Sequence, residues 1–102
     1  MKQTQKLGSL IVEAMTYKAT LESSYNAAKE LEKEAYKTVR MFEALYNQHG
    51  EYEEIGQKLD AAYELHYEAT EATREAFDKV DAITEAIEAM QSAWNTLEGL
   101  GL

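Results

Sequence analysis

Residues 52–97 read YEEIGQKLDAAYELHYEATEATREAFDKVDAITEAIEAMQSAWNTL, and apolar residues recur through this stretch at alternating spacings of three and four. One row of the repeat contains Tyr52, Leu59, His66, Thr73, Val80, Ile87 and Trp94, and the other contains Ile55, Ala62, Ala69, Ala76, Ile83, Met90 and Leu97. Spacing of this kind places both rows on one face of a single long helix, which a second helix must cover.

The first half of the chain carries a matching apolar face. Its stripe is Leu7, Leu10, Ala14, Tyr17, Leu21, Ala28, Leu31, Ala35, Phe42 and Leu45, and its flank is Ile11, Met15, Tyr25, Val39 and Tyr46. The chain has no proline, and Gly50 separates the two halves. The pattern predicts a helix over residues 5–48, a turn over 49–52 and a helix over 53–98. Gly50 suits a left-handed residue that closes the first helix, and Gly99 suits the same role in the second.

An all-α fold follows: a long antiparallel two-helix hairpin, coiled-coil-like, forming one domain over residues 1–102. Facing residues should then have numbers that sum to about 101. The expected pairs include Leu21 with Val80, Phe42 with Leu59, Tyr17 with Ile83, and Leu31 with Ala69. Ser23 or Ser24 could instead cap a new helix and split the first one, which leaves a three-helix bundle as the alternative.

The apolar faces are too broad for a single line of contact between two helices. This width favours self-association into a four-helix bundle, or docking on the helices of a partner protein. Tyr36, Tyr63 and Tyr67 are expected to cluster, and Phe77 lies beside the stripe of the second helix. These four aromatic residues are candidates for partner binding.

The net charge is −9, and it lies in the second half: residues 1–50 carry seven basic and six acidic residues, whereas residues 51–102 carry three and thirteen. This acidity argues against direct binding to nucleic acid or to an anionic membrane. The sequence contains neither an apolar run of the ~20 residues needed to span a bilayer nor the apolar core of a signal peptide. We therefore expect a cytoplasmic protein, or one exported without a cleaved signal.

Exposed carboxylates follow one side of the second helix. Three of them, Glu68, Glu71 and Glu75, are candidate partner-binding residues. They form either a solvated face or an acidic surface that enters a basic groove, as the acidic inhibitors that phages direct against host enzymes do by imitating nucleic acid.

Catalytic, metal and cofactor motifs are not expected in this chain. A di-iron bundle needs Glu-x-x-His, but Tyr63 stands three residues before His66 and Tyr46 three before His49. The sequence has no cysteine and no glycine-rich phosphate loop. His66 is expected to lie in the core and to bond a tyrosine.

The length near 100, the hairpin with a mid-chain glycine and the lack of a signal peptide resemble the WXG100 proteins of type VII secretion. Tyr67-Glu68-Ala69-Thr70-Glu71 fits the Tyr-x-x-x-Asp/Glu export motif of that family. The turn, however, is Gln48-His49-Gly50 and lacks Trp-x-Gly. The resemblance implies an exported helical hairpin, or the partner of a secreted effector.

The residues themselves favour a non-enzymatic protein-binding module: an adaptor, a small chaperone-like partner or an inhibitor. The exported hairpin and the acidic phage-type inhibitor are the alternatives.

Overall fold

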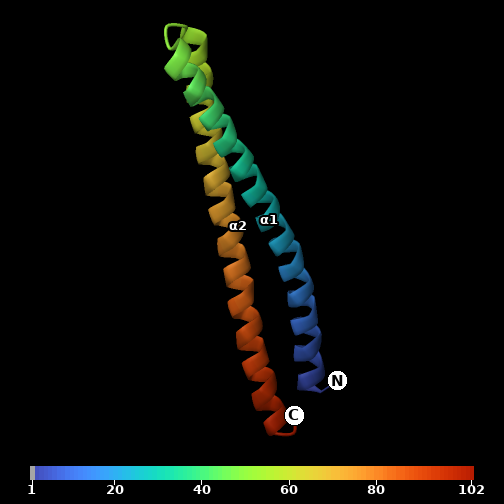
Figure 1. Ribbon diagram of the computed structural model, residues 1–102. Coiled ribbons are helices and arrows are strands. Elements are labelled where there is room, and N and C mark those ends of the chain that lie inside the picture. The colour runs from blue at the N-terminus through green and yellow to red at the C-terminus, as the bar shows by residue number, and fades with distance from the viewer. Residues whose placement is uncertain (1) are drawn as a thin grey trace. The chain divides into compact units, whose positions relative to one another are not determined.

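The computed structural model describes residues 2–102 and contains two helices, α1 (Gln3–His49) and α2 (Glu53–Gly99), which residues 50–52 connect (Figure 1). Within the described range there is no β-strand. The protein is an all-α helical hairpin, as the spacing of apolar residues predicts. The three-helix alternative is wrong, because α1 continues through Ser23 and Ser24 without a break.

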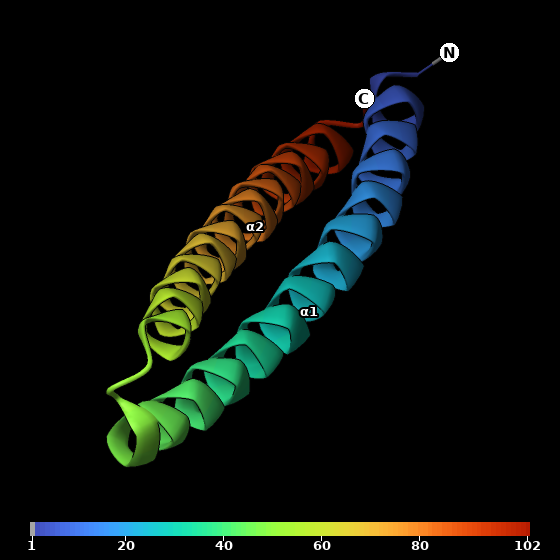
Figure 2. The same ribbon diagram turned by 90° about the horizontal axis from the view of Figure 1, so that it is seen from above.

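The chain divides into two compact units. Unit 1 contains residues 2–24 with residues 76–102, and unit 2 contains residues 25–75. In unit 2 the turn joins the two helical segments. In unit 1 the chain ends meet, because the amide and the hydroxyl of Thr4 donate hydrogen bonds to the main-chain oxygen of Leu102 at 3.4 and 3.2 Å. Both ribbon views show the N and C ends beside each other (Figures 1 and 2).

Contacts between the helices in each unit have the expected antiparallel register. In unit 1, a Cβ atom added to Gly8 would lie 3.7 Å from Nε1 of Trp94. In unit 2, the rings of Tyr36 and His66 lie 5.7 Å apart between centroids. The residue numbers of both pairs sum to 102, within one of the expected value.

The two rows predicted on α2 contain all of its buried residues. Leu59, Ala62, Ala69 and Ile87 are buried, with 3–9% of their surface accessible, and the other members are half-buried. Tyr52 is the exception at 60% exposed, since it precedes the helix.

On α1 the structure corrects the expected face. A central row is buried or half-buried as predicted: Leu7, Ala14, Leu21, Ala28, Ala35 and Phe42. The row beside it that is also covered, here called the covered flank, is Ile11, Lys18, Tyr25, Glu32 and Val39. The row on the other side, the open flank, is Leu10, Tyr17, Leu31 and Leu45, which are 52, 57, 52 and 37% exposed.

The expected pairs of Tyr17 with Ile83 and of Leu31 with Ala69 are therefore wrong. One helix covers only two adjacent rows of its neighbour. The central row can be combined with either flank, and α2 covers the flank that includes Lys18 and Glu32.

Gly50 ends α1 for a different reason from the one expected. Among residues 2–102 the only positive φ belongs to Gly101, so Gly50 is not left-handed. Instead, a Cβ atom at residue 50 would lie 2.7 Å from the main-chain oxygen of Tyr46. Only glycine fits this approach without a shift of the backbone.

The second C-cap lies two residues beyond the expected Gly99. Gly101 has φ of 77°, its amide bonds the carbonyl of Glu98 at 3.0 Å, and the amide of Leu102 bonds the carbonyl of Leu97 at 2.9 Å. These two bonds form a Schellman motif, which satisfies carbonyl groups of the last turn of α2.

Leu59→Ala tests the packing of the buried rows in unit 2. We expect the free energy of unfolding to fall by roughly 2–5 kcal/mol, because a buried leucine leaves a cavity. Leu65→Ala, at a site 44% exposed, is the matched control and should change it by at most about 0.5 kcal/mol. Urea denaturation followed by circular dichroism measures both, and equal losses would contradict the burial.

Thr70→Val tests an unpaired hydroxyl. The Oγ1 atom of Thr70 is buried without a hydrogen-bond partner, whereas Oγ1 of Thr73 donates to the carbonyl of Ala69 at 2.9 Å. Replacing the unpaired hydroxyl by a methyl group should raise the free energy of unfolding by about 1 kcal/mol. Thr73→Val loses a hydrogen bond and should not raise the free energy of unfolding. A Thr70 variant no more stable than the parent would show that this hydroxyl is satisfied in solution.

Candidate protein-binding surfaces

Tyr36 lies in a groove of unit 2 that is lined by aromatic and charged side chains. Its ring packs on His66 at 52° between the ring planes, and the guanidinium carbon of Arg40 lies 5.9 Å from its centroid. Two lysines and two glutamates line the same groove, namely Lys29, Lys33, Glu30 and Glu32. Tyr36 is still 51% exposed, so its ring contacts protein groups while about half of the residue meets solvent.

His66 is half-buried on α2, as its position in the repeat predicts. Its contact with tyrosine is made through the rings instead of the expected hydrogen bond. The sequence did not single out Arg40, Lys29 or Lys33. Arg40 follows Tyr36 by four residues, a spacing that places two side chains together on a helix and could have revealed the pair.

Tyr63 of α2 makes a side-chain contact with α1 in unit 2. Its hydroxyl donates a hydrogen bond of 2.8 Å to Oε2 of Glu43. This bond to a carboxylate, with partial desolvation and the negative charges of Glu43 and Asp60, raises the pKa of the Tyr63 phenol above its ordinary value. The bond fixes a phenol ring that is 46% exposed, and a fixed aromatic ring loses little entropy on binding.

Tyr67 is the most exposed of the three candidate tyrosines, at 66%. It follows Tyr63 by four residues, so the two rings are neighbours along α2. Tyr67-Glu68-Ala69-Thr70-Glu71 lies within α2, with 28 helical residues after it. The export motif of the WXG100 family, in contrast, follows the second helix.

The three candidate glutamates lie on α2 of unit 2, at spacings of three and four. Glu71 is half-buried and forms an ion pair with Arg74, while Glu68 and Glu75 are exposed. Phe77, the remaining candidate, belongs to unit 1 and is 49% exposed. Six of the seven candidate residues therefore lie in unit 2, and Phe77 lies in unit 1.

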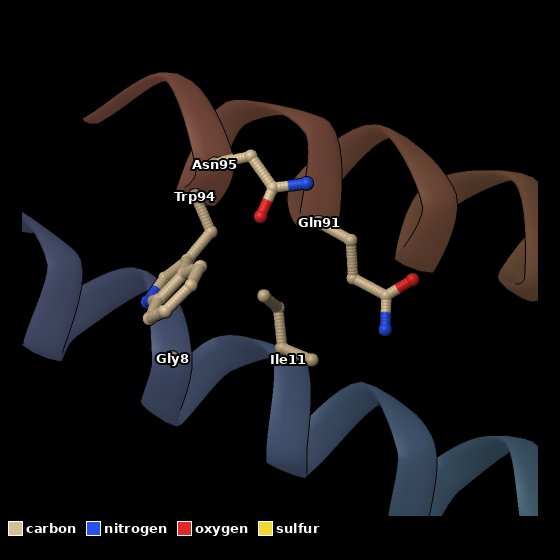
Figure 3. A pocket seen from close by; sticks show the side chains of 5 residues that line it. All are labelled: Gly8, Ile11, Gln91, Trp94 and Asn95. Atoms are coloured by element: carbon tan, nitrogen blue, oxygen red, sulfur yellow. The ribbon is translucent and has the colours of Figure 1, made fainter. Parts of the chain in front are cut away.

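A groove in unit 1 was not predicted. Figure 3 shows the indole of Trp94 lying against α1 beside Gly8, while the side chain of Ile11 points toward α2. Gln91 and Asn95 of α2 complete the lining. The indole of Trp94 thus contacts α1 at Gly8, and this contact joins the two helical segments of unit 1.

Residues 2–102 contain no group of three His, Cys, Asp or Glu side chains that could hold a metal ion. In the same range, neither helix is long and apolar enough to cross a membrane. What the surfaces do offer is exposed aromatic and aliphatic area beside charged groups, which suits contact with another protein.

The Tyr63–Glu43 bond predicts a pH-dependent contact. The neutral phenol is the donor, so the bond exists below the raised pKa of Tyr63 and is lost as the pH rises through it. Glu43→Gln removes a negative charge and should lower that pKa. Titration of ¹³Cζ-tyrosine resonances by NMR, with Tyr63→Phe to assign the signal, measures it. An unchanged midpoint would contradict the contact.

Comparison with known proteins assigns no family to this hairpin. No protein-family model matches the chain, and neither a curated protein nor a solved structure matches it.

Proposed function

We propose that this chain is a non-enzymatic protein-binding module, of the adaptor, small chaperone-like or inhibitor type, that acts through its helical faces. One observation carries the proposal. Among residues 2–102, six apolar residues are buried, and four of these six are alanine or valine, whereas sixteen large apolar residues are exposed. Exposed apolar area on this scale marks interaction surfaces in soluble proteins.

The aromatic side of unit 2 is the surface proposed for a partner. Tyr36 and Tyr63 are each fixed by a contact within the unit and are each about half exposed, and Tyr67 lies one turn from Tyr63. Tyrosine and arginine are enriched among the residues that contribute most to binding. Basic residues (Lys29, Lys33, Arg40) and acidic residues (Glu30, Glu32, Glu43, Asp60) both lie near these rings, so the exposed aromatic area, and not net charge, carries this proposal.

The acidic face of α2 supports a second candidate, an acidic inhibitor that enters a basic groove. Its support is the exposure of Glu68 and Glu75. Exposed carboxylates contribute little energy to an interface compared with aromatic residues that become buried. The aromatic side is therefore the first candidate and the acidic face the second.

Site-specific photo-crosslinking in the source organism tests the proposal. Tyr67 is replaced by p-benzoylphenylalanine, and irradiated adducts are identified by mass spectrometry. We expect one dominant protein adduct at this position. The same amino acid at Val12, which is 64% exposed against 66% for Tyr67, is the matched control and should give no such adduct.

Two second-site variants then separate the two surfaces. Tyr36→Ala should reduce the adduct several-fold, whereas reversal of Glu68, Glu71 and Glu75 to lysine should leave it unchanged. Circular dichroism confirms that each variant keeps its helicity. The opposite pattern would establish the acidic face as the binding surface, and the absence of any adduct at Tyr67 would refute the proposal for this side of unit 2.

A further inference from the structure

Two rows of unit 2 carry the same arrangement of charge around a tyrosine. In each row the tyrosine has a basic residue seven positions to one side and an acidic residue seven positions to the other. A spacing of seven keeps the three residues in one row along their helix. These six residues, here called the tyrosine face, are Lys29, Tyr36 and Glu43 on α1, and Asp60, Tyr67 and Arg74 on α2.

Both rows lie on the same side of unit 2. The hydroxyl of Tyr63 on α2 bonds Glu43, which belongs to the row of Tyr36 on α1. The row of Tyr67 runs beside Tyr63, because the two tyrosines are four residues apart. The ring contact of Tyr36 with His66, the residue before Tyr67, places the two tyrosines of the face at the same level along the helices.

The charges of the two rows have the same direction along unit 2. Glu43 and Asp60 lie six and seven residues from the turn-side ends of their helices, whereas Lys29 and Arg74 lie twenty and twenty-one residues from these ends. The tyrosines lie midway, and they are 51 and 66% exposed. A surface that is negative at one end, aromatic in the middle and positive at the other end is complementary to a copy of itself turned end for end.

We propose that a second copy of this chain binds the tyrosine face of unit 2. The two-fold axis is perpendicular to the helices and passes through the contact at the level of Tyr36 and Tyr67. In this dimer α1 packs antiparallel on α1 of the partner subunit, and α2 packs antiparallel on α2. In unit 2 the result is a four-helix bundle in which all neighbouring helices are antiparallel. The dimer rests on the proposed function of this side of unit 2 and identifies its partner.

Charge selects this axis over the other face-to-face arrangement. The perpendicular axis places Lys29 opposite Glu43 of the partner subunit, and Asp60 opposite Arg74 of the partner subunit. Each contact occurs twice, which gives four contacts between opposite charges. An axis parallel to the helices would place Lys29 opposite the partner's Arg74, and Glu43 opposite the partner's Asp60. All four contacts would then join like charges, which repel each other.

One contact between like charges remains in the proposed dimer. Lys33 lies opposite Arg40 of the partner subunit, and this contact also occurs twice. Both residues are exposed at the outer edge of α1, where solvent weakens the repulsion. The guanidinium of Arg40 is also held 5.9 Å from the centroid of the Tyr36 ring of its own chain. The four attractive contacts therefore outweigh the two repulsive ones.

Charge-reversal variants, followed by sedimentation equilibrium of the full chain, test the dimer. In Asp60→Arg this pair is positive on both sides, and in Arg74→Asp it is negative on both sides. Each variant alone should therefore dimerise at least about tenfold more weakly than the parent chain. An equimolar mixture restores both opposite-charge contacts between one chain of each variant, and its affinity should return to within about threefold of the parent. Damage to the fold of either variant could not be repaired by mixing.

Glu68→Arg is the matched control. Glu68 follows Tyr67 by one residue, about 100° around α2, which turns it away from the tyrosine face. This reversal should change the dimer affinity by less than about twofold. Circular dichroism confirms that all three variants keep their helicity. If Asp60→Arg instead strengthened the dimer, the orientation would be overturned, because only the parallel axis places residue 60 opposite the partner's Glu43.

The outcomes separate this dimer from the proposed function. A parent chain that sediments at 11.6 kDa up to about 100 µM would overturn the dimer, as would a mixture that does not regain affinity. If p-benzoylphenylalanine at position 67 then cross-linked to a different protein, the proposed function would stand. A mixture that regains affinity, together with an adduct of two copies of this chain at position 67, supports both conclusions. The absence of any adduct at this position would overturn both.

Discussion

The apolar surface of α1 is three rows wide, and a single neighbouring helix covers only two of them. The central row from Leu7 to Phe42 belongs to two possible packing faces, one with each flank. Once α2 covers the flank that runs from Ile11 to Val39, the open flank that contains Leu10 and Tyr17 must face solvent or another protein. The exposed apolar residues of α1 are thus a geometric consequence of helix width.

This constraint explains how far the sequence alone could predict the fold. On α2 only one pair of rows is apolar over the whole repeat, so the buried positions from Leu59 to Leu97 follow from spacing. On α1 both flanks satisfy the same spacing, and hydrophobicity favours the wrong one, because the covered flank includes Lys18 and Glu32. Both side chains have long aliphatic stems that can pack while the charged group reaches solvent. A count of apolar residues therefore underestimates how well Lys18 and Glu32 can pack between the helices.

The sequence predicted the residue types of the candidate surface but not the contacts that fix them. Exposed aromatic residues beside a helical stripe could be identified from the repeat. The contacts that fix them depend on the register between two helices: Tyr36 meets His66, and Tyr63 reaches Glu43 twenty residues away. An error of one residue in register turns a side chain by about 100° around its helix, so sequence spacing alone could not identify these pairs. Glu71 follows Tyr67 by four residues and so lies beside it on α2, whereas Phe77 belongs to unit 1.

The residues that fill the core also connect folding with binding. Ala35, Ala62 and Ala69 in unit 2 are nearly inaccessible, and their small side chains let two helices approach closely. An alanine, however, buries little apolar area, and stabilisation scales with that area at about 25 cal/mol per Å². A core of this kind therefore fixes the register between the two helices. It contributes only a limited free energy of unfolding. A partner that covers the exposed aromatic or aliphatic rows binds the folded chain only, and it therefore adds its binding free energy to the stability of the hairpin.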